Sequence, residues 1–196
     1  VTLPSLVGDM NHEDPLNPGA PSRSTPEQPQ AEEDHRFGQA SAMMGLAFLR
    51  KLQGAVSAWL PARTTVKEAF AARHENHPSG RLMILPRAGI PWKEHLYNIE
   101  ETEGLTDDQK LLYVLYPEKE DPGSKWRIQA VSKSLSSFEN RKGLPEPWRG
   151  MRDAELDQVL GPDAEDGAVF VHASGFIGGH KTRAGVRAMA VKALES

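Results

Sequence analysis

The sequence contains no cysteine, no long apolar run and no excess of positive charge, and each absence excludes a class of protein. Without cysteine there can be no disulfide, no thiolate metal site and no thiol catalysis. No apolar run is long enough to cross a bilayer, so we expect no membrane-spanning segment. The net charge of −4 argues against nucleic-acid binding through overall charge, which needs many Lys and Arg contacts with phosphate. A local basic groove is still compatible with this composition.

The first residues also lack the features of a natural start. The chain begins at Val1 without an initiator methionine, a basic region or an apolar targeting core. We interpret the chain as a segment of a longer protein. Residues that complete an active site are then expected upstream of Val1.

The first 78 residues divide into a proline-rich segment and a segment with apolar residues at helical spacing. Residues 1–36 hold six prolines in the first thirty positions and have little to bury, which predicts a flexible leader or loop. From Phe37 to Trp59 apolar residues recur at helical spacing, and a second helix is expected from Pro61. We therefore interpret residues 37–78 as a helical connector.

Residues 79–196 have the mixed pattern of a second domain. A turn-prone segment at 117–124 between two apolar runs predicts a β-hairpin. The expected strands are 81–86, 110–116, 125–131 and 168–173, and the expected helices are 91–101, 153–160 and 182–194. The predicted fold class is α/β (α+β), with a mixed sheet of about four to five strands flanked by helices and a long helix or helical pair before it.

The most informative stretch is Ala168–Gly185, in which an apolar strand, a glycine pair and a basic helix start follow one another. One interpretation is a tight connection between strand and helix. The other is an anion cradle, in which Gly178 and Gly179 offer backbone N–H groups at a helix N-terminus. The side chains that would add donors to this cradle are His180, Lys181 and Arg183.

Tryptophans beside basic residues are further candidates for nucleic-acid contacts, because an aromatic ring can stack on any base. Trp92, Trp126 and Trp148 are such residues, although core packing is the commoner role of tryptophan. Trp148 is the strongest of the three, since its loop is polar and stiffened by proline and carries Arg149.

Other chemistries receive little support. His172 and His180 have no carboxylate at ligand-like spacing, and Ser174 is not part of a Gly-x-Ser-x-Gly element. The glycine spacing matches neither the dinucleotide-binding nor the Walker pattern, so an enzyme with a nucleotide cofactor is set aside.

Five motifs carry a resemblance to a known family. They are WLPAR at 59–63, PWKEHLY at 91–97, KWRIQ at 125–129, LPEPWRG at 144–150 and FVHASGFIGGH at 170–180. In this order they resemble the melanocyte-proliferating-gene exonuclease family, DHH-like 3′–5′ RNA exonucleases of mitochondria and nucleus. The last motif is similar to the glycine–histidine motif of the substrate-binding domain that follows the catalytic domain in DHH-type phosphoesterases.

The resemblance implies that this chain is the C-terminal, substrate-binding half of such an enzyme. The family's T-H-x-G-x-F-H-x-D-E-like and Asp-His-His elements are absent, so no catalytic residue and no metal ligand is expected here. A divalent metal, Mn or Mg, is expected in the missing N-terminal half, and RNA is the expected partner. The residues expected to hold the RNA 3′ end or its phosphate are Gly178, Gly179, His180, Lys181, Arg183, Trp148 and Arg149.

The resemblance also implies a mitochondrial and nuclear or nucleolar location. An alternative remains open from another class of function. The chain could be a non-catalytic interaction or dimerisation module, with the helix at 37–59 presenting its apolar stripe to a partner or to a second copy.

Overall fold

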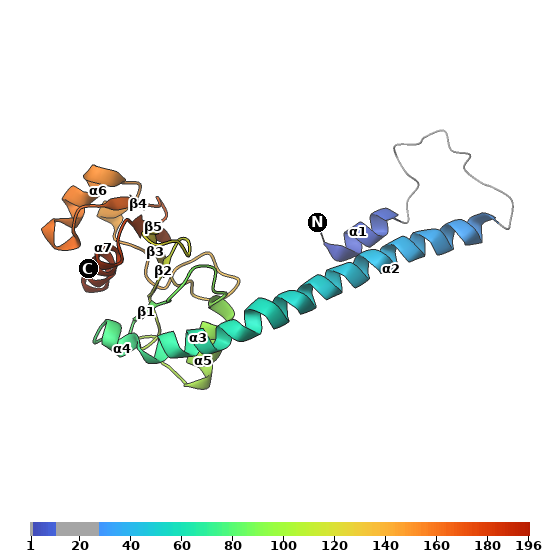
Figure 1. Ribbon diagram of the computed structural model, residues 1–196, viewed down its shortest axis with the longest axis horizontal. Coiled ribbons are helices and arrows are strands. Elements are labelled where there is room, and N and C mark those ends of the chain that lie inside the picture. The colour runs from blue at the N-terminus through green and yellow to red at the C-terminus, as the bar shows by residue number, and fades with distance from the viewer. Residues whose placement is uncertain (1, 11–27) are drawn as a thin grey trace. The chain divides into compact units, whose positions relative to one another are not determined.

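The computed structural model describes residues 2–10 and 28–196, and it divides into two compact units (Figure 1). The first unit is Val1–Ser57 and the second is Ala58–Ser196. The second unit contains the sheet and both hydrophobic core clusters, whereas the described part of the first unit from Leu3 onward is helical.

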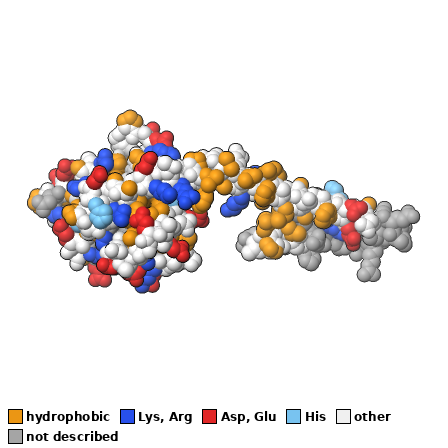
Figure 2. Space-filling model, turned by 90° about the horizontal axis from the view of Figure 1, so that it is seen from below, with side chains coloured by type: hydrophobic (Ala, Val, Ile, Leu, Met, Phe, Trp, Pro, Cys, Tyr) orange, Lys and Arg blue, Asp and Glu red, His pale blue; other side chains and the backbone are white. Residues whose placement is uncertain are grey.

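Two helices form the described part of the first unit. The short helix α1 (Leu3–Met10) contacts α2 (Gln28–Gly54). Along α2, the side chains of Phe37 and Phe48 are 74% and 66% exposed, and Figure 2 shows hydrophobic side chains along this helix.

The expected leader at 1–36 is therefore helical at both of its ends, and residues 11–27 lie outside the described residues. Helix α2 begins at Gln28, well before the expected Phe37. Pro29 is compatible with this start, because a proline in the first turn of a helix loses no hydrogen bond. The proline content of this stretch obscured the helix in the sequence.

The second unit begins with helices. A π-helical turn (Ala55–Trp59) lies between α2 and α3 (Leu60–Ala71), and the expected Pro61 lies in the first turn of α3. The short helix α4 (Arg73–Asn76) follows. The remaining helices are α5 (Lys93–Thr102), α6 (Asp153–Leu160) and α7 (Arg183–Glu195). Among the described residues, no helix has the length and apolar character needed to span a membrane.

A five-stranded mixed sheet forms the centre of this unit and confirms the predicted fold class. Its strands are β1 (Leu82–Ile84), β2 (Tyr113–Pro117), β3 (Trp126–Ala130), β4 (Ala168–Val171) and β5 (Ile177–His180). Their order is β1-β2-β3-β5-β4; β1 and β2 are parallel, and the other pairs are antiparallel. The expected hairpin is the β2–β3 pair.

Helices cover the two faces of the sheet unequally. On one face α7 buries the apolar stripe that its sequence predicts, with Val186, Met189, Ala190 and Ala193 fully inaccessible to solvent. On the other face α3 and α5 pack over residues of β1 and β2, including Met83 and Val114. The residues of β3, β5 and β4 on this second face belong to neither core cluster.

The glycine–histidine stretch is a strand, which corrects the predicted turn. Residues 172–176 make the turn instead, with Gly175 at a φ of 70°, and β5 then runs between β3 and β4. Glycine is depleted in strands, so β5 was not apparent from the sequence.

His180 ends β5 as a fully buried side chain, with 0% of its surface exposed. Its Nδ1 accepts a hydrogen bond from the backbone N–H of Thr182 at 3.0 Å. The imidazole ring lies directly against Gly185 of α7, where a Cβ atom would overlap the ring. Glycine at this position therefore allows α7 to pack over the end of β5.

We expect Gly185→Ala to lower the free energy of unfolding by about 2 kcal/mol, because a rigid backbone and a buried ring must separate. Chemical denaturation of the purified chain measures this change. Gly45→Ala is the matched control, since nothing lies within 4 Å of a Cβ atom at that position and alanine favours helix. Equal stability of the Gly185→Ala variant and the wild type would contradict the packing argument.

Candidate functional site

A groove of about 640 Å³ lies at the edge of the sheet where β1, β2 and β5 end and β3 begins. The first residues of α7 form part of its wall. The side chains and backbone that line it come from Pro86, Arg87, Pro117, Lys119, Glu120, Asp121, Gly123, Ser124, Trp126, Lys181, Thr182 and Arg183. Three segments distant in sequence thus meet here: the end of β1, the β2–β3 turn and the start of α7.

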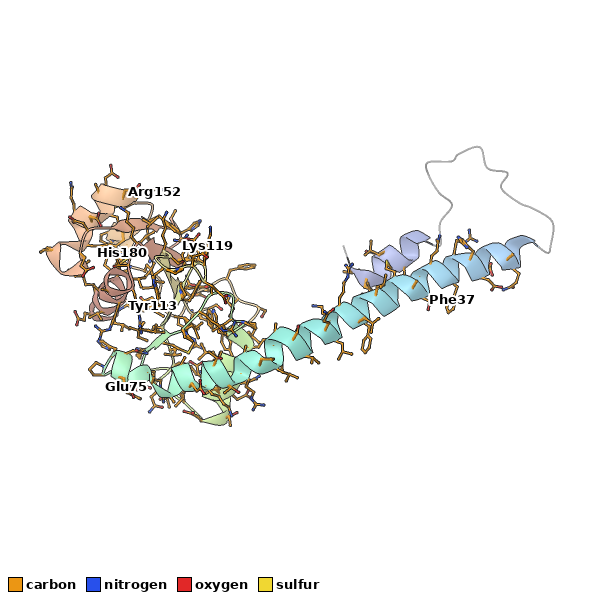
Figure 3. The ribbon with its side chains drawn as sticks, viewed as in Figure 1. Phe37, Glu75, Tyr113, Lys119, Arg152 and His180 are labelled. Carbon is orange, nitrogen blue, oxygen red and sulfur yellow. The ribbon has the colours of Figure 1, made fainter. Side chains whose placement is uncertain are left out.

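The groove carries more positive than negative charge. Arg87 lies 3.9 Å from the Glu120 carboxylate and is partly neutralised by it. Lys119, Lys181 and Arg183 form no ion pair with any described acidic residue. These three cations are therefore available to an anionic ligand. Lys119 is labelled in Figure 3.

An aromatic ring and a helix N-terminus complete this arrangement. The guanidinium carbon of Arg183 lies 5.6 Å from the centre of the Trp126 ring, within the range of a cation–π contact. Thr182 caps α7, since its Oγ1 accepts a hydrogen bond from the backbone N–H of Gly185 at 2.9 Å. The positive end of the helix dipole consequently faces the same groove as Lys181 and Arg183.

The structure changes the contribution expected from Gly178 and Gly179. Both lie in β5, which is paired on each side, so their backbone N–H groups lie in the plane of the sheet. The backbone cradle is therefore a wrong prediction. The missing side chains admit close neighbours instead: at Gly179 a Cβ atom would meet the guanidinium of Arg127.

The predicted binding residues do not form one cluster. His180 is buried beneath α7 and lines no part of the groove, while Lys181 and Arg183 do line it. Trp148 is 6% exposed and belongs to the hydrophobic core, so its ring has no free face for stacking. Arg149 donates from Nε to the carbonyl oxygen of Leu144 at 2.9 Å.

Arg149 also lies at the other end of β5. Its side chain packs against Gly175 in the β4–β5 turn, whereas Lys181 and Arg183 follow His180 at the opposite end of the strand. Arg87 and Lys119 line the groove but were not singled out from the sequence. Lys119 lies in the turn-prone segment of the expected hairpin, so a basic residue in that turn was the available signal.

Arg127 occupies the second face of the sheet, opposite Trp126 in the alternation along β3. Its Nη2 atom forms an ion pair with Glu118 at 2.8 Å, and its guanidinium lies 5.1 Å from the Phe170 ring centre. Its buried Nη1 atom has no hydrogen-bond partner among the described residues. On the same face the hydroxyl of Tyr116 donates to Oε1 of Gln129 at 2.8 Å.

The described residues do not fit a catalytic metal. In the described parts of the chain, no group of three or more His, Asp or Glu side chains could hold a metal ion. His172 is an exposed turn residue whose Nδ1 lies 2.9 Å from Ser174 Oγ.

Comparison with known proteins decides the family. The MYG1 exonuclease family model, described as "Uncharacterised protein family (UPF0160)", matches residues 1–194. This chain belongs to the MYG1 exonuclease family. No solved structure matches it significantly.

Relatives in the MYG1 family come from distant organisms. The chain is 45% identical to the MYG1 exonuclease of Homo sapiens over 162 residues, which are 83% of this chain and 41% of the human protein. It is 42% identical to a Caenorhabditis elegans MYG1 protein over 169 residues, covering 86% and 48% of the two chains. For a Saccharomyces cerevisiae MYG1 protein the identity is 37% over 161 residues, covering 82% and 45%. The chain thus spans less than half the length of these relatives.

The burial of two tyrosine side chains in this MYG1-family chain can be tested by a pH titration. Burial raises the pKa of Tyr116 and of Tyr113 above the ordinary tyrosine value of about 10. Because the folded pKa is raised, the associated stability is present below pH 10 and is lost as the pH rises through the folded values. We expect Tyr116→Phe to remove one late step from the tyrosinate absorbance titration of the folded chain.

The urea-unfolded chain is the reference, since its tyrosines titrate near their ordinary pKa of about 10. A folded chain in which Tyr116 titrates together with the unfolded chain would contradict the burial of its hydroxyl.

Proposed function

We propose that this chain is the half of a metal-dependent 3′–5′ exoribonuclease that binds the RNA 3′ end. The observation that carries the proposal is the groove at the start of α7, where Lys119, Lys181 and Arg183 have no described acidic partner. Family membership supports a nuclease role for the whole protein, and relatives in mammals are named exonucleases. An exonuclease must hold a phosphate-bearing chain end, and this groove has the charge for it.

The groove offers two kinds of contact to a terminal nucleotide. Lys181 and Arg183 are suited to phosphate oxygens, since charge-assisted hydrogen bonds to anions are stronger than neutral ones. The N-terminus of α7 adds the partial positive charge of its unpaired backbone N–H groups. Trp126 positions Arg183 through their cation–π contact.

The remaining parts of the proposal concern the other half of the enzyme. We place the catalytic Mn or Mg ion in the part of the family proteins that this chain does not span, within a DHH-like domain. There the metal would activate water for attack on the phosphodiester. The proposal includes the mitochondrial and nuclear location implied by the resemblance. We expect this chain by itself to bind RNA without hydrolysing it.

The binding test uses the purified chain and a short single-stranded RNA with a fluorescent label at its 5′ end. We expect the double variant Lys181→Ala, Arg183→Ala to weaken binding at least about tenfold, since each charged hydrogen bond contributes about 1.5–3 kcal/mol. The dependence of affinity on salt should also become shallower, because fewer phosphates are contacted. Fluorescence anisotropy at several salt concentrations measures both effects.

The matched control is Arg50→Ala, Lys51→Ala on α2, which makes the same change in net charge at exposed positions. It should bind RNA like the wild type. If both double variants lose affinity equally, binding depends on overall charge and the groove is not the site.

A second candidate function is self-association through α2. Phe37, Met44, Phe48 and Leu52 are exposed and follow one another at spacings of seven, four and four, so they form a stripe on one side of the helix. The stripe is uncharged and can therefore pair with its copy in a second chain without opposing like charges. A homodimer would cover these side chains.

Light scattering coupled to size-exclusion chromatography tests the homodimer. At increasing concentration we expect the mass to approach that of two chains, and Phe48→Glu to keep the chain monomeric because a charge would be buried at the contact. Arg50→Glu, on the side of α2 opposite the stripe, is the control and should not prevent pairing. A wild-type chain that stays monomeric at every concentration would exclude this function.

A further inference from the structure

A second groove, of about 480 Å³, lies on the face of β3 that no core cluster covers. Its floor includes Gln129, and its walls come from the start of α5, the loop after β3 and the β4–β5 turn. Lys93, Gln129 and Phe176 belong to three of the family motifs, but none of them lines the groove at the start of α7, which is proposed to bind the RNA 3′ end.

Its chemistry suits an unpaired nucleotide. The aromatic rings of Phe138 and Phe176 line it, and their residues are 102% and 37% exposed, so ring faces are available for stacking. Gln129 accepts from Tyr116 through Oε1, which leaves its amide N–H groups to donate to a base edge. Lys93 is the single charged residue among the described lining residues, and its charge complements a phosphate.

Strand β3 connects the two grooves. Trp126 lines the groove at the start of α7, and Gln129 lines the second groove from the opposite face of β3, about 10 Å further along the extended strand. Arg127 lies between them on the same face as Gln129 and carries the buried Nη1 atom without a described partner. The polar side chains of Arg127 and Gln129 thus share one face of this strand.

We infer that the second groove binds an unpaired base of the same RNA, at a nucleotide upstream of the terminal one. This inference rests on the proposed function, and it adds that the substrate is single-stranded beyond its 3′ end. Phe138 stacks on the base, Gln129 donates to its edge and Lys93 contacts the adjoining phosphate.

An apolar protein segment is the competing occupant of this groove. Such a partner would use the hydrophobic area of Phe138 but would not need the face of an aromatic ring. The free amide donors of Gln129 and the cation Lys93 favour a nucleotide, because a buried apolar segment would leave the amide unsatisfied.

The experiment compares the binding of a dinucleotide with that of an unstructured RNA octanucleotide by the full chain. We expect Phe138→Ala to weaken octanucleotide binding at least about fivefold, the lower range of a lost base–aromatic stack, and to leave the dinucleotide unchanged. Phe138→Trp should retain octanucleotide affinity and Phe138→Leu should lose it. Leu135→Ala removes another exposed apolar side chain from the same loop, outside the groove, and should have no effect.

The outcomes separate this inference from the proposed function. If Phe138→Ala leaves octanucleotide binding unchanged while Lys181→Ala, Arg183→Ala still weakens it, the second groove does not bind RNA but the end-binding groove does. If Phe138→Leu binds like the wild type, stacking is excluded and the inference fails. If the wild-type chain binds neither RNA, the inference and the proposed function both fail.

Discussion

The contact between Gly185 and the buried His180 ring is the constraint on which the site depends. It brings the start of α7 onto the end of β5, because any larger residue at 185 would push the helix away from the imidazole. Thr182 joins the two residues: its backbone N–H donates a hydrogen bond to His180, and its hydroxyl oxygen caps α7 by accepting one from the backbone N–H of Gly185. Lys181 and Arg183 flank it and are thereby held at the edge of the sheet.

The sheet separates structural and chemical roles between its two faces. On the α7 side, Ile128 and its neighbours are buried in a continuous core. On the opposite side, Arg127 and Gln129 alternate with those core residues and stay at least partly accessible. One strand therefore stabilises the unit through one set of side chains and offers polar groups through the other. Gly179 of β5 allows Arg127 to lie on this polar face, since a side chain at 179 would occupy the space of the Arg127 guanidinium.

Much of the fold was predictable because local periodicity was strong. The apolar stripe of α7 and the hairpin of β2 and β3 follow directly from residue spacing. The strand β5 was not predictable, since two of its four residues are glycine and its stability comes from pairing on both sides. The start of α2 at Gln28 was not predicted, because the many prolines before Phe37 indicated a loop. A proline is nevertheless tolerated in the first turn of a helix.

The family motifs and the basic residues at 181 and 183 can be recognised in the sequence alone, as can the lack of the family's metal-binding elements. Which of the candidates face the groove became clear from the packing of the folded chain. Trp148 and His180 are buried, whereas Arg87 and Lys119 join Lys181 and Arg183 in one groove. The reason is physical: spacing along a chain specifies neighbours within one helix or strand, but exposure and convergence depend on how distant segments pack.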